Sequence, residues 1–214
     1  MSSTHQLTLP LQEAQVRALK TGDLVYLSGE LVMTAGLPTH QRILACVQSG
    51  QPLPLNLAGE VLLQFGGYNR EVDGRMQVVY MNPTTSTRFN PYMPTLIRKL
   101  GLRAVGGKGG LDAESARAMQ ESGCVYLSFP GGGCTLYSGA IREVLAVEWR
   151  DLILHYRLMR LRVENLGPGT VGIDAAGNSL YDQLAAQAAQ RLPEILEQLR
   201  RARAQAAASR GAPS

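Results

Sequence analysis

Two polar loops, each directly after a short apolar run, constrain the fold of this chain more than any other feature. The first loop spans residues 82–88 and follows the apolar residues 76–81; the second spans residues 106–110 and follows residues 102–105. Short apolar runs that end in turn-forming residues are typical of strands. The sequence therefore predicts two strands, each with a polar loop at its carboxyl end.

The stretch between the two loops predicts a helix. Residues 93–100 carry apolar side chains at helical spacing and stop at Gly101, a residue typical of helix C-termini. Strand, loop, helix, strand and loop together form the repeating unit of a parallel α/β sheet. In such a sheet both loops lie at the carboxyl edge of the strands, where ligands bind. We therefore expect an α/β fold in which side chains of the two loops share one pocket.

The first loop carries three hydroxyls and a guanidinium, those of Thr84, Thr85, Ser86 and Arg88. The hydroxyls alone also fit an ordinary turn that caps the following helix, and an isolated arginine is more often a solvated charge. Beside a second cation, however, these groups suit a small carboxylate or phosphate. The loop is therefore a candidate anion-binding segment.

Lys108 in the second loop has glycines on both sides, so it serves no local helix or strand. Glycines such as Gly107 and Gly109 allow close backbone approach and positive φ, which an anion-binding loop requires. The loop is not a nucleotide-binding P-loop, because Leu102 stands at the position of that motif's first glycine and Gly109 at that of its Ser or Thr. We expect Lys108 to bind an anion together with Arg88.

The chain lacks a complete catalytic set of its own. His40 is compatible with a base, a ligand or a buried hydrogen-bonding residue, and the sequence identifies no partner for His5 or His155. The carboxylates lie at turns or helix caps, and no pair has the spacing of an acid and a base. Anion-binding groups without an electrophile suggest that half of the active site lies elsewhere.

Composition excludes several classes of protein. Cys46, Cys124 and Cys134 are too few for the four thiolates of a common iron–sulfur cluster, and no spacing indicates a zinc site. The formal charge of +4 is concentrated from Arg191 onward, where there are five Arg and two Glu, so no basic face for nucleic acid is expected. With no apolar run near the roughly 20 residues of a membrane span and no signal peptide, the expected location is the cytoplasm.

Further elements follow from periodicity and turn signals. Strands are expected at residues 24–28, with a break at Gly29, and at 61–65, 124–129, 157–163 and 170–174, the last two separated by a turn at 167–169. Asp112 is expected to cap a helix that runs through Ser122 and ends at Gly123. A turn is expected at Asp73 and Gly74.

The C-terminal part reads as one helix followed by a tail. The helical spacing begins at Ser179, and Pro193 is expected to kink or split the helix. After Arg203 the sequence is rich in Ala, Ser, Gly and Pro and has no large apolar side chains to bury in a core. The expected organisation is one domain over residues 1–185, a C-terminal helix over 186–203 and a disordered tail over 204–214.

These motifs resemble one family, the β subunit of iron–sulfur hydro-lyases. It includes the L(+)-tartrate dehydratase β subunit and the C-terminal domain of class I fumarases. The specific part is the Thr-Thr-Ser-x-Arg element of the first loop combined with the Gly-Lys-Gly-Gly loop at residues 107–110. Residues 21–29, 40–43 and 173–177 add to a similarity that covers residues 7–184.

The resemblance implies a swivelling β/α/β domain that closes over a [4Fe–4S] cluster. In this family the cluster cysteines lie in a partner α subunit or domain, so the chain is expected to bind no metal by itself and to form a heteromer. One cluster iron acts as a Lewis acid on the substrate hydroxyl while a base removes the proton from the adjacent carbon. The implied reaction is addition or elimination of water on a small hydroxycarboxylic acid.

The resemblance also implies roles for single residues. Thr84 and Thr85 match hydroxyls at the substrate, with Thr84 implicated in the proton transfer, and His40 matches a histidine near the catalytic site. Arg88 and Lys108 match the groups that bind the substrate carboxylate. The other implied substrate-binding positions in the two loops are Ser86, Gly107 and Gly109.

The sequence departs from the family at Gly36, where the family has the arginine of an Arg-Asp-x-x-His motif that holds a substrate carboxylate. Loss of one charge-assisted contact is expected to cost about 1.5–3 kcal/mol of binding free energy. We therefore expect a substrate with an apolar end, contacted by Leu37 and Pro38. The alternative is a divergent, non-catalytic subunit that binds small anions or serves in assembly.

Overall fold

The computed structural model describes residues 2–210, with side chains described as far as residue 206. Two compact units divide the chain between Ser179 and Leu180. The first unit is a mixed α/β domain, and the second is a single helix. The candidate functional residues all belong to the first unit.

Within the described residues, seven strands of the first unit form one sheet in the order β1-β2-β3-β6-β7-β9-β8. The first five of these are parallel to their neighbours, and β8 and β9 run antiparallel. An α/β domain with a parallel central part was predicted and is confirmed. The strands are β1 Thr4–Thr8, β2 Leu24–Met33, β3 Val61–Leu63, β6 Ala104–Gly107, β7 Val125–Ser128, β8 Ile141–Glu148 and β9 Leu158–Ile173.

The sheet closes on itself because β9 pairs with β2 as well as with β7. The β2–β9 register runs from Leu24 opposite Thr170 to Met33 opposite Met159. Strands β2, β3, β6, β7 and β9 therefore form a closed ring of pairings. Alternation along β2 places Val25, Leu27 and Met33 in the main hydrophobic core.

Pairing with β2 also explains two wrong strand predictions. Both β2 and β9 are continuous, although breaks were predicted at Gly29 and at residues 167–169. The β2–β9 ladder spans both positions and accommodates them by shifts of register, between Leu27 and Gly29 on β2 for example. A long antiparallel partner kept each strand extended through residues that usually begin a turn.

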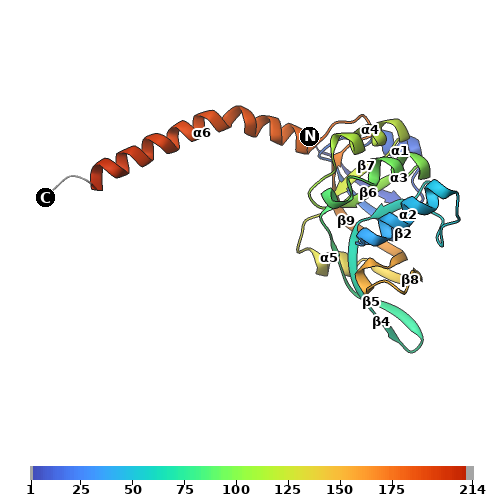
Figure 1. Cartoon of the computed structure of the whole chain (residues 1–214). Helices are drawn as coiled ribbons and strands as arrows, with labels where there is room; N and C mark the ends of the chain where they lie inside the picture. Colours follow the sequence, from blue (N-terminus) through green and yellow to red (C-terminus); the bar gives the residue numbers. More distant parts are fainter. Residues whose placement is uncertain (1, 211–214) are drawn as a thin grey trace. The chain divides into compact units, whose positions relative to one another are not determined.

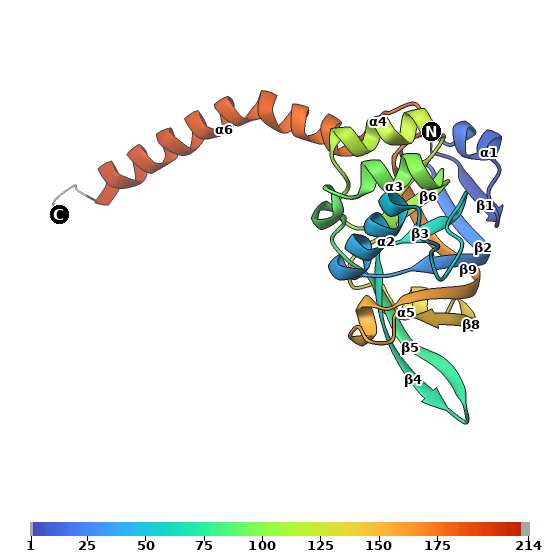
Figure 2. The same cartoon turned by 45° about the vertical axis from the view of Figure 1, so that its right-hand side comes forward.

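The helices of the first unit are short, and α2, α3 and α4 lie along one side of the sheet (Figures 1 and 2). Two predicted helix ends are confirmed: α3 ends at Gly101 with φ 58°, and α4 is capped by Asp112, whose Oδ1 accepts a hydrogen bond from the Ser115 N–H at 2.9 Å. Their bounds are α1 Glu13–Ala18, α2 Leu37–Ser49, α3 Met93–Leu100, α4 Ala113–Ser122 and α5 Cys134–Ser138, with 3₁₀ helices η1 Ser86–Phe89 and η2 Leu154–Tyr156.

Strands β4, Phe65–Val72, and β5, Arg75–Pro83, form a separate antiparallel hairpin. The predicted turn at Asp73 and Gly74 joins them. The prediction that β5 belongs to the same parallel sheet as β6 is wrong, because β5 pairs with β4 along its whole length. The hairpin extends beyond the sheet in Figures 1 and 2. Its base carries the first polar loop.

The second unit is helix α6, Leu180–Arg210. Pro193 lies inside it, and the helix continues on both sides of this residue. It also extends beyond Arg203, where the sequence analysis ended it, and residues 211–214 of the expected tail lie outside the described part of the chain. Among the described residues, no helix is both long and apolar enough to cross a membrane.

Candidate functional site

The two polar loops meet through direct backbone contacts. Thr85 and Lys108 form an isolated parallel bridge. The Ser86 N–H donates to the Lys108 carbonyl at 2.8 Å, and the Lys108 N–H donates to the Thr84 carbonyl at 2.9 Å. The loops were predicted to meet, but at the edge of one sheet. They meet instead because the residues that follow β5 pair with those that follow β6, at the Thr85–Lys108 bridge.

The backbone of Gln64 connects the two loops to the sheet by hydrogen bonds. Its N–H donates to the Gly106 carbonyl at 2.6 Å, and its carbonyl accepts from the Thr84 N–H at 2.8 Å. Gln64 lies between β3 and β4, so this residue links the closed sheet to the hairpin. Backbone hydrogen bonds on both sides thus fix the first loop on a rigid support.

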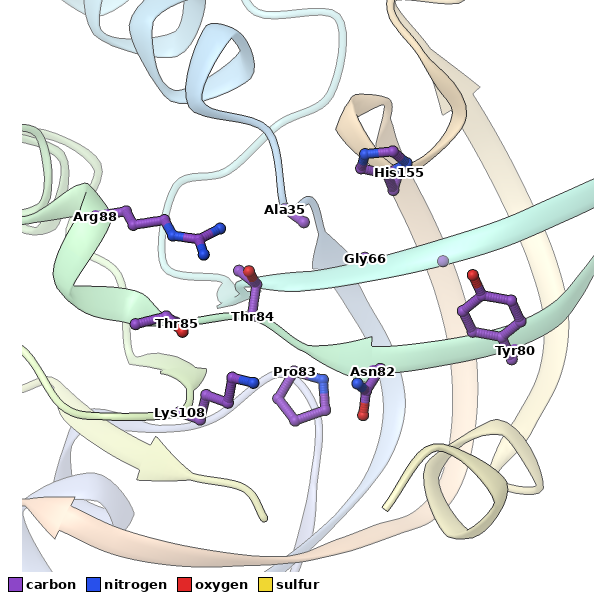
Figure 3. A pocket seen from close by; sticks show the side chains of 11 residues that line it. Ala35, Gly66, Tyr80, Asn82, Pro83, Thr84, Thr85, Arg88, Lys108 and His155 are labelled. Atoms are coloured by element: carbon purple, nitrogen blue, oxygen red, sulfur yellow. The ribbon is translucent and has the colours of Figure 1, made fainter. Parts of the chain in front are cut away.

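A pocket of about 360 Å³ opens over the joined loops. This volume lies at the lower end of the range for small-molecule sites. Figure 3 shows Arg88 and Lys108 on one side of it, Thr84 near its centre, and His155 and Tyr80 on the other side. The lining residues are Ala35, Gly66, Gly67, Tyr80, Asn82, Pro83, Thr84, Thr85, Arg88, Lys108 and His155.

The charged side chains that line the pocket are all positive. Arg88 and Lys108 both line it, and neither side chain makes an ion pair or a hydrogen bond with the described residues. None of the described lining residues is Asp or Glu. Two cations without protein counter-charges favour an anionic ligand. Thr84, Thr85, Arg88 and Lys108 therefore share one pocket, as the sequence predicted.

Ser86 belongs to the first loop but does not line the pocket. Its side chain is fully buried, and its hydroxyl accepts a hydrogen bond from the Tyr126 hydroxyl at 2.8 Å. The same Tyr126 oxygen accepts from the Gly110 N–H at 3.3 Å. Ser86 therefore connects η1 to the second loop through Tyr126, a contact between distant residues that the loop sequence does not disclose.

Gly107 and Gly109 shape the second loop, and neither lines the pocket. A Cβ at Gly107 would lie 2.3 Å from the Ser86 Oγ and 3.0 Å from the Thr84 carbonyl oxygen. Only glycine therefore permits the two loops to approach this closely. Gly109 has φ 83°, which turns the chain directly after Lys108.

His40 is fully buried on α2 and does not line the pocket. Its ring stacks on Phe89 of η1 with centroids 3.9 Å apart, and Nδ1 lies 2.7 Å from the Gly36 carbonyl. Burial lowers the pKa of His40 to about 4, against a smaller upward effect of the hydrogen bond with Gly36. The ring is therefore neutral near pH 7 and packs directly behind the segment that carries Arg88.

His155 and Tyr80 line the pocket, although the sequence analysis gave neither a role. His155 lies on η2, whose sequence matches no motif, and it reaches the pocket because the Ala35 N–H donates to the His155 carbonyl at 3.1 Å. Leu37 and Pro38, expected to contact the substrate, are absent from the lining. Only tertiary contacts identify this side of the pocket.

The chain's own residues do not suit an iron–sulfur cluster. Cys46 and Cys134 lie on separate helices, and Cys124 is buried beside β7, where desolvation raises the pKa of its thiol. In the part of the chain that the structure describes, no group of three His, Cys, Asp or Glu side chains is placed to hold a metal ion. The pocket itself has no cysteine lining.

Comparison with known proteins shows which family the chain resembles. A profile of the family described as Fumarase C-terminus matches residues 2–184. A Methanocaldococcus jannaschii protein, provisionally named L(+)-tartrate dehydratase subunit beta, is 32% identical over 187 residues, which cover 87% of this chain and 95% of that protein. The L(+)-tartrate dehydratase subunit beta of Escherichia coli K12 is 28% identical over 193 residues, 90% of this chain and 94% of that protein.

A larger protein also matches. A Geobacillus stearothermophilus protein, provisionally named fumarate hydratase class I, is 30% identical over 192 residues. The match covers 89% of this chain and 36% of that protein. The same sequence pattern therefore occurs both as a separate polypeptide and within a longer one.

Proposed function

The chain belongs to the fumarase C-terminal family, and we propose that it acts as the β subunit of an iron–sulfur hydro-lyase that adds or removes water on a small hydroxycarboxylic acid. Relatives that match nearly their whole length are named as β subunits of a dehydratase. The reaction needs a carboxylate-binding site and a group that handles a proton. This chain supplies the carboxylate-binding part.

One observation carries the proposal: Arg88 and Lys108 face one pocket without counter-charges, next to the hydroxyl-bearing residue Thr84. A carboxylate between the two cations receives charge-assisted hydrogen bonds from both. The reacting carbon beside that carboxylate then lies near Thr84. Because backbone hydrogen bonds fix Thr84 to Gln64 and Lys108, little reorganisation is needed when the substrate binds.

In this proposal Thr84 takes part in the proton transfer, and Thr85 completes the polar wall of the pocket. Ser86, Gly107 and Gly109 belong to the binding machinery because they hold the loops in place. His40 acts as a positioning residue: its ring supports Phe89, next to Arg88, and does not touch the substrate. A threonine hydroxyl needs a base to activate it.

The remaining half of the active site belongs to a partner α subunit, which also carries the [4Fe–4S] cluster. The thiols and carboxylates of the described residues do not fit the cluster, and the resemblance assigns it to the partner. The chain swivels to close its pocket over the partner, and the heteromer operates in the cytoplasm. The isolated chain should therefore take up no stoichiometric iron on anaerobic reconstitution.

The test is ligand binding and turnover in the complex reconstituted with the α subunit. Lys108→Ala should weaken binding of a hydroxycarboxylate by about 1.5–3 kcal/mol, the range for a hydrogen bond to a charged group. Lys99→Ala, an exposed lysine on α3, is the matched control and should leave binding unchanged. Unchanged affinity in Lys108→Ala would contradict the proposed site. Binding without turnover in an iron-loaded complex would instead favour the non-catalytic alternative.

A further inference from the structure

We propose that His155 selects the far end of the substrate by donating a hydrogen bond to a second carboxylate. This inference rests on the proposed function, because it takes the end at Arg88 and Lys108 as the site of the first carboxylate. His155 lines the same pocket, across Thr84 and Gly66 from the two cations in Figure 3. Its ring nitrogens make no ion pair or hydrogen bond with the described residues.

The backbone around His155 is held in place by the loop that precedes α2 and by the first turn of α2. The Ala35 N–H donates to the His155 carbonyl at 3.1 Å, and the Tyr156 carbonyl accepts hydrogen bonds from the hydroxyls of Thr34, at 3.1 Å, and Thr39. The Tyr156 ring packs edge-on against the His155 ring with centroids 4.6 Å apart. The backbone that carries the imidazole is therefore fixed before any ligand binds, which lowers the entropic cost of the contact.

Small residues leave the space for this histidine open. A Cβ built at Gly66 lies 3.2 Å from the Ala35 Cβ and 3.4 Å from the His155 Cβ. Any side chain there would crowd the entrance between the two ends of the pocket. Tyr80 stands on the same side as His155 and stacks on Tyr68, with ring centroids 6.2 Å apart, so its ring is also supported.

The chemistry of the far side suits an anionic group better than an apolar one. Imidazole carries at least one N–H donor in either protonation state, and the Tyr80 hydroxyl is a second donor. No described residue of the lining is a carboxylate, so the lining does not oppose a second negative charge. Both side chains are exposed in this chain. An alkyl end would gain no hydrogen bond from either of them, whereas a carboxylate can accept one from each. The apolar end expected from Leu37 and Pro38 is thus replaced by a polar one.

The experiment compares two ligands that differ only at the far end. L-malate carries a second carboxylate where 2-hydroxybutanoate carries a methyl group. Binding of each to the complex reconstituted with the α subunit is measured by calorimetry or by competition. His155→Ala should weaken malate binding about tenfold or more and change 2-hydroxybutanoate binding by less than about twofold. His155→Arg, which restores a donor and a charge, should recover the preference for malate.

Two controls separate the possible failures. Ile153→Ala, an exposed residue just before η2, should leave the ratio of the two affinities unchanged. Lys108→Ala should weaken both ligands, because it removes a contact at the shared end. If Lys108→Ala weakens both and His155→Ala alters them equally or not at all, the role of His155 is overturned. If Lys108→Ala affects neither ligand, the proposed function itself fails.

Discussion

Lys108 donates its backbone N–H to the Thr84 carbonyl at 2.9 Å, so the lysine and the threonine of the candidate site are held by one hydrogen bond. The Ser86 N–H returns a second bond, to the Lys108 carbonyl, at 2.8 Å. This pair of bonds fixes the spacing between the backbone positions of Lys108 and Thr84, which come from different supersecondary units. Changes that disturb it should affect stability and ligand binding together.

Gly107→Ala tests the close approach of the two loops. The new Cβ would lie 2.3 Å from the Ser86 Oγ and 3.0 Å from the Thr84 carbonyl oxygen, so the loops must separate. We expect a loss of about 1–3 kcal/mol in the free energy of unfolding, as for other overpacked sites, and weaker hydroxycarboxylate binding. Gly139→Ala, whose Cβ meets nothing closer than 3.4 Å, is the control. Equal effects of the two substitutions, measured by urea denaturation, would contradict the crowding argument.

Ser86→Ala tests whether Ser86 positions the loops. The substitution removes the acceptor that the Tyr126 hydroxyl uses at 2.8 Å in a fully buried place. We expect the free energy of unfolding to fall by about 1–3 kcal/mol. Thr87→Ala changes an exposed hydroxyl on the same 3₁₀ helix and should cost less than about 0.5 kcal/mol. A variant that loses affinity while keeping full stability would show that Ser86 contacts the ligand directly.

Gly36→Ala tests the packing of η2 against the loop before α2. The added Cβ would lie 2.9 Å from both the Cβ and the carbonyl oxygen of Tyr156, next to His155. Because backbone atoms of η2 must move, we expect a loss of about 1–3 kcal/mol in unfolding free energy. Larger residues, including arginine, should be worse. If thermal unfolding shows that Gly36→Arg keeps its stability, then η2 can move at little cost, and the tight packing contributes little to the free energy of unfolding.

His40 predicts the direction of a pH effect on stability. Burial lowers its pKa from 6.5 to about 4, so the folded chain keeps the ring neutral where the unfolded chain binds a proton. The stability from this group is complete above pH 6.5 and is lost as the pH falls towards 4, by about 3 kcal/mol in total. His40→Gln, which does not titrate, should flatten the curve of unfolding free energy against pH in this window. An unaltered slope in that variant would assign the effect to other groups.

The sequence by itself determined the local features of this protein. The ends of α3 and α4 followed from Gly101, Asp112 and Gly123, because capping depends on residues a few positions apart. The turn at Asp73 and Gly74 followed for the same reason. The sequence also identified the loops that carry Thr84, Arg88 and Lys108, since hydroxyls, cations and glycines without a structural use are visible in a single chain.

The tertiary structure decided how those features are assembled. The pairing of β5 with β4, and of β9 with β2, joins residues far apart in the chain, and several pairings satisfy the same apolar pattern. For the same reason the burial of Ser86 and the arrival of His155 at the pocket were not predictable. From the sequence, a buried, hydrogen-bonding His40 was one of three alternatives, and only the structure selected it. A side chain's neighbours across the fold determine whether it faces a ligand or the core, and those neighbours depend on the register of the whole sheet.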